Sequence, residues 1–313
     1  MSDPTRSYLK VAYDLRPAKQ VERRMLIDAF QRLAAAGFSI SDYQYTGFGS
    51  IYFVDFILFH KLLGIENLLS VEWDERIARR VNFNVPFKGV RVKIAAIGDV
   101  IPTLSAELRH IVWLDYDDLI RESQLQDVAE ATSTLSTGSI VLITVDAEPP
   151  AGDGPKEWRQ YFEAEASAYI GDRQSNEDYE LAKLPMLNAH IIDQAIKQGL
   201  AGRIGVTFQP LFNFVYRDGH RMVTVGGMLT TESERRRLRS SSLVDMPYCR
   251  RSLDISPYDI RVPRLTRKER LYLDGAMPCA DDWQPEDFEL SQEDALAYRD
   301  VYRFFPAYAE LLL

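Results

Sequence analysis

The stretch of sequence that decides the fold is a short apolar run ending in a glycine turn, Tyr45-Thr46-Gly47-Phe48-Gly49-Ser50. Three later runs end in carboxylates instead, and helix-like segments separate all four runs. The three ends are Val71-Glu72-Trp73-Asp74, Trp113-Leu114-Asp115-Tyr116-Asp117 and Thr144-Val145-Asp146-Ala147-Glu148. Strands that alternate with helices form a parallel sheet, and ligands bind in the crevice at the carboxyl ends of its strands. The four ends therefore predict a binding site along one edge of a sheet.

The rest of the chain extends this sheet to seven strands. The runs that predict strands fall at residues 43–46, 67–72, 90–96, 110–115, 139–146, 203–216 and 221–229. The last two are joined by Arg217-Asp218-Gly219-His220, and Asp-Gly between two apolar runs is a strong hairpin signal. We therefore predict an α/β fold with a doubly wound, mostly parallel seven-stranded sheet that ends in an antiparallel hairpin.

Two segments stand outside this alternation. Residues 149–185 break the rhythm with a proline- and glycine-rich start and many aromatic residues, so we interpret them as an insertion over the crevice. This insertion belongs to a predicted domain of residues 1–240. Residues 241–313 carry several prolines and two helical patterns, and they predict a C-terminal helical extension packed on that domain.

An amphipathic helix is predicted ahead of the first strand, at residues 18–36. Its apolar stripe has three- and four-residue spacing, and Gly37 stops it. The basic residues off that stripe are Lys19, Arg23, Arg24 and Arg32. We expect this helix to pack on the sheet with its arginines within reach of the crevice.

Composition excludes several classes of protein. No apolar stretch approaches the roughly 18 uninterrupted residues that a membrane span needs, and residues 1–10 lack the apolar core of a signal peptide. The only cysteines, Cys249 and Cys279, are interpreted as reduced thiols. The four histidines share no metal-ligand spacing, which argues against a structural zinc site. We therefore expect a cytoplasmic protein without a membrane segment.

Charge is unevenly spread along the chain. The net charge is −9, but residues 235–270 hold eleven basic against four acidic residues. Residues 281–300 are strongly acidic. Such asymmetry is typical either of an anionic partner or of two solvated faces that pair with each other.

The glycine turn and the acids after it predict the kind of ligand. Gly47 and Gly49 let the backbone approach a ligand where the first strand turns into a helix. Glu72 ends the second strand, 23 residues after Gly49, where a carboxylate accepts hydrogen bonds from both ribose hydroxyls. Asp99 follows the third strand, where an adenine amino group needs an acceptor. Both acids also have a simpler interpretation as caps of the helices that follow them.

Other nucleotide motifs fit less well. A dinucleotide fingerprint places its third glycine at position 52, which is Tyr52 here, so an NAD-dependent oxidoreductase is disfavoured. The pattern of a phosphate-binding loop, in which a lysine is followed by serine or threonine, is absent as well.

This order of strands, glycine turn and acid resembles the class I S-adenosylmethionine-dependent methyltransferases, which have a Rossmann-like fold. The stretches around residues 45–53 and 112–117 also look like a bacterial group labelled "putative O-methyltransferase". The resemblance covers about residues 18–230. It implies that S-adenosylmethionine binds here and that the reaction is methyl transfer, O-directed, to an acceptor that the sequence does not identify. The cofactor-binding residues that it implies are Thr46, Gly47, Phe48, Gly49, Glu72, Trp73, Asp99 and Asp115.

Catalytic residues are predicted by the same resemblance. Catechol-type enzymes hold magnesium with an aspartate after strand four and an Asp-Asn pair after strand five, and Asp115 and Asp146 occupy comparable places. Ala147 stands in place of the asparagine, and no lysine follows Asp115 to act as a general base. We expect Asp115, Tyr116 and Asp146 to be catalytic, with Mg²⁺ bound by Asp115 and Asp146 as a further expectation.

An alternative function keeps this fold without catalysis. A degenerate subunit would bind nucleotide or nucleic acid through the basic segment 235–270, where tyrosines are interleaved with arginines and can stack on bases. The residues that carry this alternative are Arg235, Arg236, Arg237 and Arg239. The overall acidity of the chain argues against it.

Overall fold

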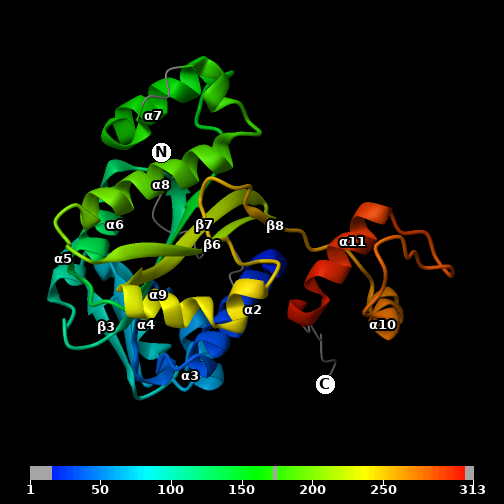
Figure 1. The fold of residues 1–313 in the computed structure, drawn as a ribbon, viewed down its shortest axis with the longest axis horizontal. Coiled ribbons are helices and arrows are strands. Elements are labelled where there is room, and N and C mark those ends of the chain that lie inside the picture. The colour runs from blue at the N-terminus through cyan, green and yellow to red at the C-terminus, as the bar shows by residue number, and fades with distance from the viewer. Residues whose placement is uncertain (1–15, 172–174, 307–313) are drawn as a thin grey trace.

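A twisted eight-stranded sheet forms the centre of the computed structural model, which describes residues 16–171 and 175–306 (Figure 1). The strand order is β3-β2-β1-β4-β5-β7-β6-β8. The strands are β1 (Gln44–Gly47), β2 (Asn67–Glu72), β3 (Val90–Ile94), β4 (His110–Leu119), β5 (Ile140–Asp146), β6 (Thr207–Asp218), β7 (His220–Thr230) and β8 (Tyr258–Ile260). Residues 1–10, which lack the apolar core of a signal peptide, lie outside the described residues.

The pairing of the strands confirms the predicted fold. Strands β1 to β5 are parallel, β7 runs antiparallel to β5, and β6 and β7 form the predicted hairpin. The sheet has one strand more than predicted, because β8 pairs in parallel with the end of β6. Three residues after a proline gave no strand signal in the sequence, so the first part of the C-terminal extension was not recognised as part of the sheet.

Helices cover both faces of the sheet, as expected for a doubly wound fold. One apolar core lies between the sheet and α2 (Pro17–Ala35), α3 (Val54–Leu63), α4 (Ala78–Phe83) and α9 (Glu232–Arg239). The other core lies beneath α5 (Ile97–Val100), α6 (Glu122–Thr134), α7 (Pro155–Ile170) and α8 (Leu184–Leu200). The strands β1, β4 and β5 are buried on both faces, which explains their near-continuous apolar sequences.

Helix α2 is fixed at its start by a residue about 200 positions away. Pro17 suits the first turn, where a backbone N–H has no partner within the helix. The carboxylate of Asp218 accepts hydrogen bonds from the N–H groups of Ala18 and Lys19, at 3.0 and 2.8 Å. Asp218 belongs to the hairpin turn, so α2 begins at the same edge of the sheet as the carboxyl ends of the parallel strands.

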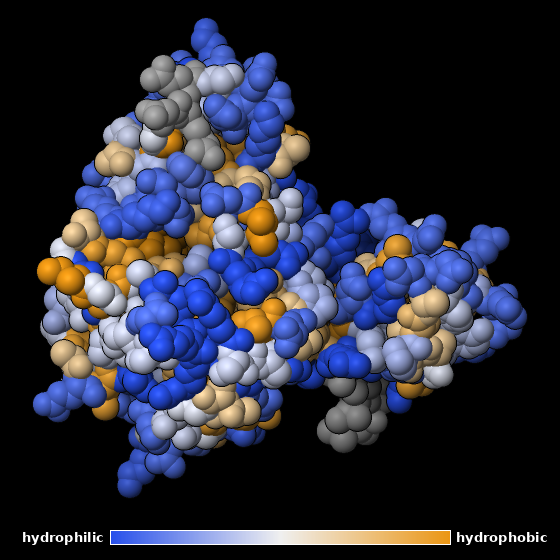
Figure 2. Space-filling view, viewed as in Figure 1, coloured by the Kyte–Doolittle hydropathy of each residue, from blue (hydrophilic) through white to orange (hydrophobic). Residues whose placement is uncertain are grey.

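The last part of the chain, with α10 (Arg267–Ala276) and α11 (Gln292–Val301), lies beside the main body, and its surface is mostly hydrophilic (Figures 1 and 2). Arg261, just after β8, forms ion pairs with Asp259 and with Glu293 of α11. Arg299 pairs with Asp281. Some of the basic and acidic residues of this region therefore pair with each other, as the simpler interpretation of the charge pattern predicted.

No helix within the described residues combines the length and the apolar character that a membrane span requires. Cys249 and Cys279 are both free thiols, and both are half-buried.

Candidate functional site

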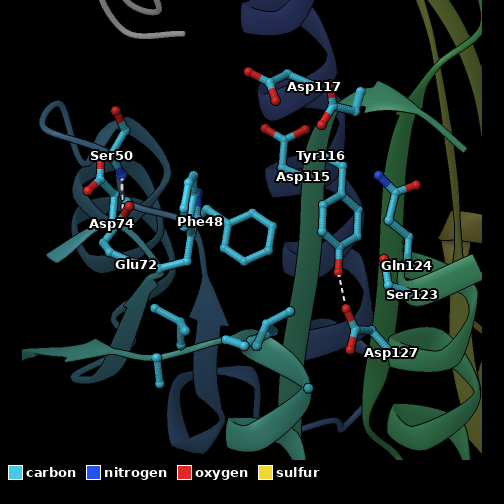
Figure 3. Close-up of a pocket in the computed structure, with 18 of the residues that line it drawn as sticks. Phe48, Ser50, Glu72, Asp74, Asp115, Tyr116, Asp117, Ser123, Gln124 and Asp127 are labelled. Atoms are coloured by element: carbon cyan, nitrogen blue, oxygen red, sulfur yellow. Dashed lines mark hydrogen bonds between the residues drawn. The ribbon is translucent and has the colours of Figure 1, made fainter. Parts of the chain in front are cut away.

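A cavity of about 500 Å³ opens at the carboxyl ends of β1 to β4, where the sequence predicted the crevice (Figure 3). Its wall comes from the turn after β1, the ends of β2 and β4, the segment after β3 and the start of α6. These segments are residues 48–50, 71–74, 95–99 and 115–118, together with Arg121, Ser123, Gln124 and Asp127. The volume is in the range of sites for small organic ligands.

The glycine turn is shaped by packing beneath it. A Cβ atom on Gly49 would lie 2.5 Å from Ser70 Oγ and 2.8 Å from the ring of Phe53, so no larger side chain fits there. A Cβ on Gly47 would lie 2.6 Å from the hydroxyl of Tyr45. Phe48 and Gly49 line the cavity, whereas Thr46 and Gly47, the other predicted cofactor residues of the turn, do not.

A hydrogen bond from this turn to Glu72 connects the turn to the end of β2. Its side chain is buried, and Oε1 accepts hydrogen bonds from the Ser50 N–H at 2.7 Å and from Ser70 Oγ at 3.2 Å. Both of these hydrogen bonds use Oε1, so Oε2 is the oxygen that would accept a hydrogen bond from a ligand. Burial raises the pKa of Glu72, although the hydrogen bonds from Ser50, Ser70 and Gly49 oppose that rise.

The adjoining wall is partly aromatic and partly acidic. Trp73 lines the cavity with 65% of its surface exposed, and Asp99 reaches the wall from α5. The hydroxyl of Tyr116 donates a 2.6 Å hydrogen bond to Asp127 of α6 (Figure 3), and its ring packs on that of Phe48 at 5.3 Å between centroids. Burial raises the pKa of Asp127, and the negative charge of Asp99 adds to this rise while Tyr116 opposes it.

Asp115 lies on the cavity wall above a buried lysine. The Nζ atom of Lys19 is 2.6 Å from Asp115 Oδ1. Burial alone raises the pKa of Asp115, but the positive charges of Lys19, Arg23 and Arg16 outweigh it and hold this pKa below its usual value. Of the arginines of this helix, Arg23 lines the cavity and forms an ion pair with Asp55 of α3, whereas Arg24 and Arg32 do not line it.

Asp146 is not among the residues that line the cavity. In the register of β4 and β5, Asp115 is opposite Thr144 and Asp146 is opposite Leu119, so the two carboxylates stand at different heights along the sheet. Asp146 accepts hydrogen bonds from His220 Nδ1 at 2.8 Å and from the Glu148 N–H at 2.7 Å.

The predicted magnesium site therefore does not fit these residues. Asp115 and Asp146 do not converge, and each carboxylate already has its own hydrogen-bonded partner. Within the described parts of the chain, no three histidine, cysteine or carboxylate side chains gather closely enough to hold a metal ion.

The basic helix α9 lies at the opposite edge of the sheet. It follows the end of β7, which is antiparallel to β5, and its Glu234 pairs with Arg109 just before β4. Arg235 and Arg236 form ion pairs with Glu232, and Arg237 donates to the carbonyl of Gly37. Arg239 lies at the exposed end of the helix. These four arginines are thus remote from the cavity.

Comparison with known proteins gives a family. The family model described as "Putative O-methyltransferase" matches residues 11–313. A comparison with curated proteins gives no match.

Solved structures show a distant likeness. The Trm1 structure from Pyrococcus horikoshii in complex with S-adenosyl-L-methionine has 10% identity and a TM-score of 0.44, with coverage of 71% of this chain and 57% of that one. The plantazolicin methyltransferase BamL, solved with SAH, has 16% identity and a TM-score of 0.41, with coverage of 67% and 73%. A putative O-methyltransferase from Klebsiella pneumoniae has 13% identity and a TM-score of 0.40, with coverage of 71% and 84%. Because the family model spans nearly the whole sequence, this chain belongs to the family described as "Putative O-methyltransferase".

Proposed function

We propose that this protein is an S-adenosylmethionine-dependent methyltransferase that acts on a hydroxyl group of its acceptor. Membership of the O-methyltransferase family supports this assignment. The observation that carries it is the buried carboxylate of Glu72, which stands beside the Phe48-Gly49 turn on the wall of one cavity. An acid in that position suits the two hydroxyls of a ribose.

The lining of the cavity suggests how the cofactor would lie. Glu72 would accept hydrogen bonds from the ribose, and Trp73 and Ile77 offer apolar surface for the adenine ring, with Asp99 as an acceptor for its amino group. Strand β1 lies between β2 and β4, so the ends of β2 and β4 are about 10 Å apart. The methionine part would then reach toward Asp115, the end from which the methyl group leaves.

Methyl transfer requires mainly that the protein align the methyl group of the cofactor with the hydroxyl of the acceptor. In an in-line displacement the C–S bond of the sulfonium breaks as a bond from carbon to the acceptor oxygen forms, and the hydroxyl proton must leave. His220 lies at the same edge of the sheet, with 75% of its side chain exposed. If its Nδ1–H is donated to Asp146, its Nε2 atom would be the acceptor for that proton, and Asp146 would orient the ring.

The acceptor would enter beneath the insertion 149–185, as the sequence predicted. In support, Tyr161 of α7 donates a 3.0 Å hydrogen bond to the carbonyl of Ile120, next to the cavity residue Arg121. The free thiols of Cys249 and Cys279 support a reducing, cytoplasmic compartment.

Methyl-labelled S-adenosylmethionine tests the direction of transfer. The purified protein would be incubated with paired acceptors that share one aromatic scaffold and differ only in bearing a phenol or an aniline group. We expect label in the phenols and none in the anilines. Label in the anilines alone would contradict O-methylation, and His220→Gln is expected to lower the rate without changing cofactor affinity.

A further inference from the structure

A fully buried ammonium group lies directly beneath the cavity. The side chain of Lys19 has no exposed surface, and its Nζ atom is 2.6 Å from Asp115 Oδ1 and 2.8 Å from Glu22 Oε2. The same atom lies 4.3 Å from the centre of the Trp113 ring, a cation–π distance. Lys19 is therefore held by Glu22 of its own helix, by Asp115 and Trp113 of β4 and, through its backbone N–H, by Asp218 of β6.

This trio of Lys19, Glu22 and Asp115 has an unbalanced charge. When both carboxylates are ionised, one ammonium faces two negative charges, and the sum is −1. Glu22 has no exposed surface, whereas Asp115 keeps 19% of its side chain exposed on the cavity wall. Burial raises the pKa of Glu22, and the negative charge of Asp115 adds to this rise, whereas the pKa of Asp115 is lowered. Asp115 is therefore the carboxylate that stays ionised beside Lys19, and it is the one that faces the cavity.

Other charged and titratable groups surround Asp115 as well. Helix α2 supplies Arg23, the residue just before this helix supplies Arg16, and α3 supplies Asp55 through its pair with Arg23. The phenol groups of Tyr45 and Tyr216 face it from β1 and β6. Lys19 is the group with the largest effect among those that keep the carboxyl ionised.

We propose that Lys19 is a positioning residue, which holds the Asp115 carboxylate ionised and aimed at the positively charged methionine end of S-adenosylmethionine. This inference rests on the proposed function. Lys19 reaches the cavity only through Asp115, so it acts on the ligand indirectly.

The test uses the double variant Lys19→Met/Glu22→Gln. This variant removes the ammonium group together with the Glu22 carboxyl, so Asp115 loses its partner and no unpaired buried acid is left at position 22. Lys19→Met alone would leave two unpaired carboxylates and risks unfolding the protein. The two probes are S-adenosylmethionine and 5′-methylthioadenosine, which keeps the adenosine and the sulfur but lacks the amino acid and the positive charge.

We expect the double variant to bind S-adenosylmethionine about tenfold more weakly or worse, the scale of a lost interaction with a charged group. Its affinity for 5′-methylthioadenosine should stay the same. Without Lys19, burial would raise the pKa of Asp115, so the affinity of the variant for S-adenosylmethionine should fall further as the pH is lowered. The wild-type protein, whose Asp115 stays ionised, should lack this Asp115-dependent loss.

The matched control breaks an ion pair at the opposite edge of the sheet. Arg109→Met/Glu234→Gln also removes one charge of each sign, from a 3.0 Å pair remote from the cavity. We expect this variant to bind both probes as the wild type does.

Two outcomes separate failure of this inference from failure of the proposed function. In the first outcome the wild type binds both probes, and the double variant either loses affinity for both in parallel or keeps its affinity for both. Lys19 then has only a structural role, and the inference is overturned. If the wild type binds neither probe, the proposed function itself fails, and the inference falls with it.

Discussion

The backbone N–H of Ser50 donates a 2.7 Å hydrogen bond to the carboxylate of Glu72, so the acid that ends β2 is joined to the turn that follows β1. Ser50 has a left-handed backbone conformation, with φ of 52°, and this hydrogen bond helps to hold it there. One carboxylate therefore shapes the turn through Oε1 and offers Oε2 to a ligand.

Substitution of Glu72 separates these two roles. Glu72→Gln can still accept the Ser50 hydrogen bond but has no negative charge for the ribose, whereas Glu72→Ala loses both. We expect Glu72→Ala to weaken binding of S-adenosylmethionine by about 1–3 kcal/mol, with the fold retained. Glu72→Gln should lose a smaller part of this affinity. Titration calorimetry of the three proteins measures it, and normal binding by Glu72→Ala would show the ribose assignment to be wrong.

The raised pKa of Glu72 gives stability and binding opposite responses to pH. Burial raises this pKa above its ordinary value of 4.5, so at pH values between the two the folded protein binds more protons than the unfolded chain. The contribution of Glu72 to the free energy of unfolding is therefore full below about pH 4.5 and is lost as the pH rises through the raised pKa. Cofactor affinity should change the other way, because the ribose needs the ionised form. Melting temperatures of wild type and Glu72→Gln, compared from about pH 4 to about pH 8, should diverge over this interval, and parallel curves would contradict the prediction.

Removal of one hydroxyl tests the wall formed by Tyr116. Tyr116→Phe loses the 2.6 Å hydrogen bond to Asp127, and we expect it to lower the free energy of unfolding by about 1–2 kcal/mol and to weaken cofactor binding. Tyr161→Phe is the matched control, since it loses a 3.0 Å hydrogen bond to a backbone carbonyl outside the cavity wall. Chemical denaturation and calorimetry should show lost stability in both variants but weaker cofactor binding only in Tyr116→Phe. Equal affinity in the two variants would count against a role for Tyr116 in the site.

The close packing beneath the glycine turn predicts that a side chain at position 49 destabilises the protein. In Gly49→Ala the new methyl group would meet Ser70 Oγ at 2.5 Å and the Phe53 ring at 2.8 Å, so the turn must shift. We expect a loss of about 1–3 kcal/mol in stability, together with weaker cofactor binding. Gly202→Ala is the control, because its Cβ would have no neighbour within 4 Å. A Gly49→Ala protein as stable as the control would show that the turn tolerates a side chain.

Binding of nucleic acid by the basic helix α9 stays a prediction from the sequence, and substitutions in this helix test it. Because α9 lies at the edge of the sheet opposite the cavity, Arg236→Ala/Arg239→Ala should leave the affinity for S-adenosylmethionine unchanged. If nucleic acid binds there, the affinity of the wild type for single-stranded DNA or RNA should fall steeply with salt, and this variant should reduce the slope. A variant that weakened cofactor binding would contradict the placement of α9.

The parts of the fold that the sequence predicted are those with strong local patterns. The buried strands β1 to β5 and the Asp-Gly hairpin have such patterns, and both the parallel pairing and the hairpin were confirmed. Strand β8 has only three residues, and its pairing with β6 depends on tertiary contacts that leave no periodic signal.

The residues of the site were likewise predicted only in part, because only some of their positions are fixed by the order of strands and helices. Residues at strand ends are fixed by topology, so Phe48, Gly49, Glu72 and Asp115 were placed on the wall correctly. Lys19 was seen only as a basic residue off the apolar stripe of its helix, because its pair with Asp115 spans 96 residues of sequence. Asp146 was grouped with Asp115 because both end strands, but the register of β4 and β5 sets them apart.

The most direct test of the proposed function is calorimetric titration of the purified protein with S-adenosylmethionine and S-adenosylhomocysteine, and with NAD for comparison. The proposed function predicts micromolar dissociation constants for the first two ligands, on the order of −8 kcal/mol, and no binding of NAD. Failure of both S-adenosyl ligands to bind, or tighter binding of NAD, would contradict the account.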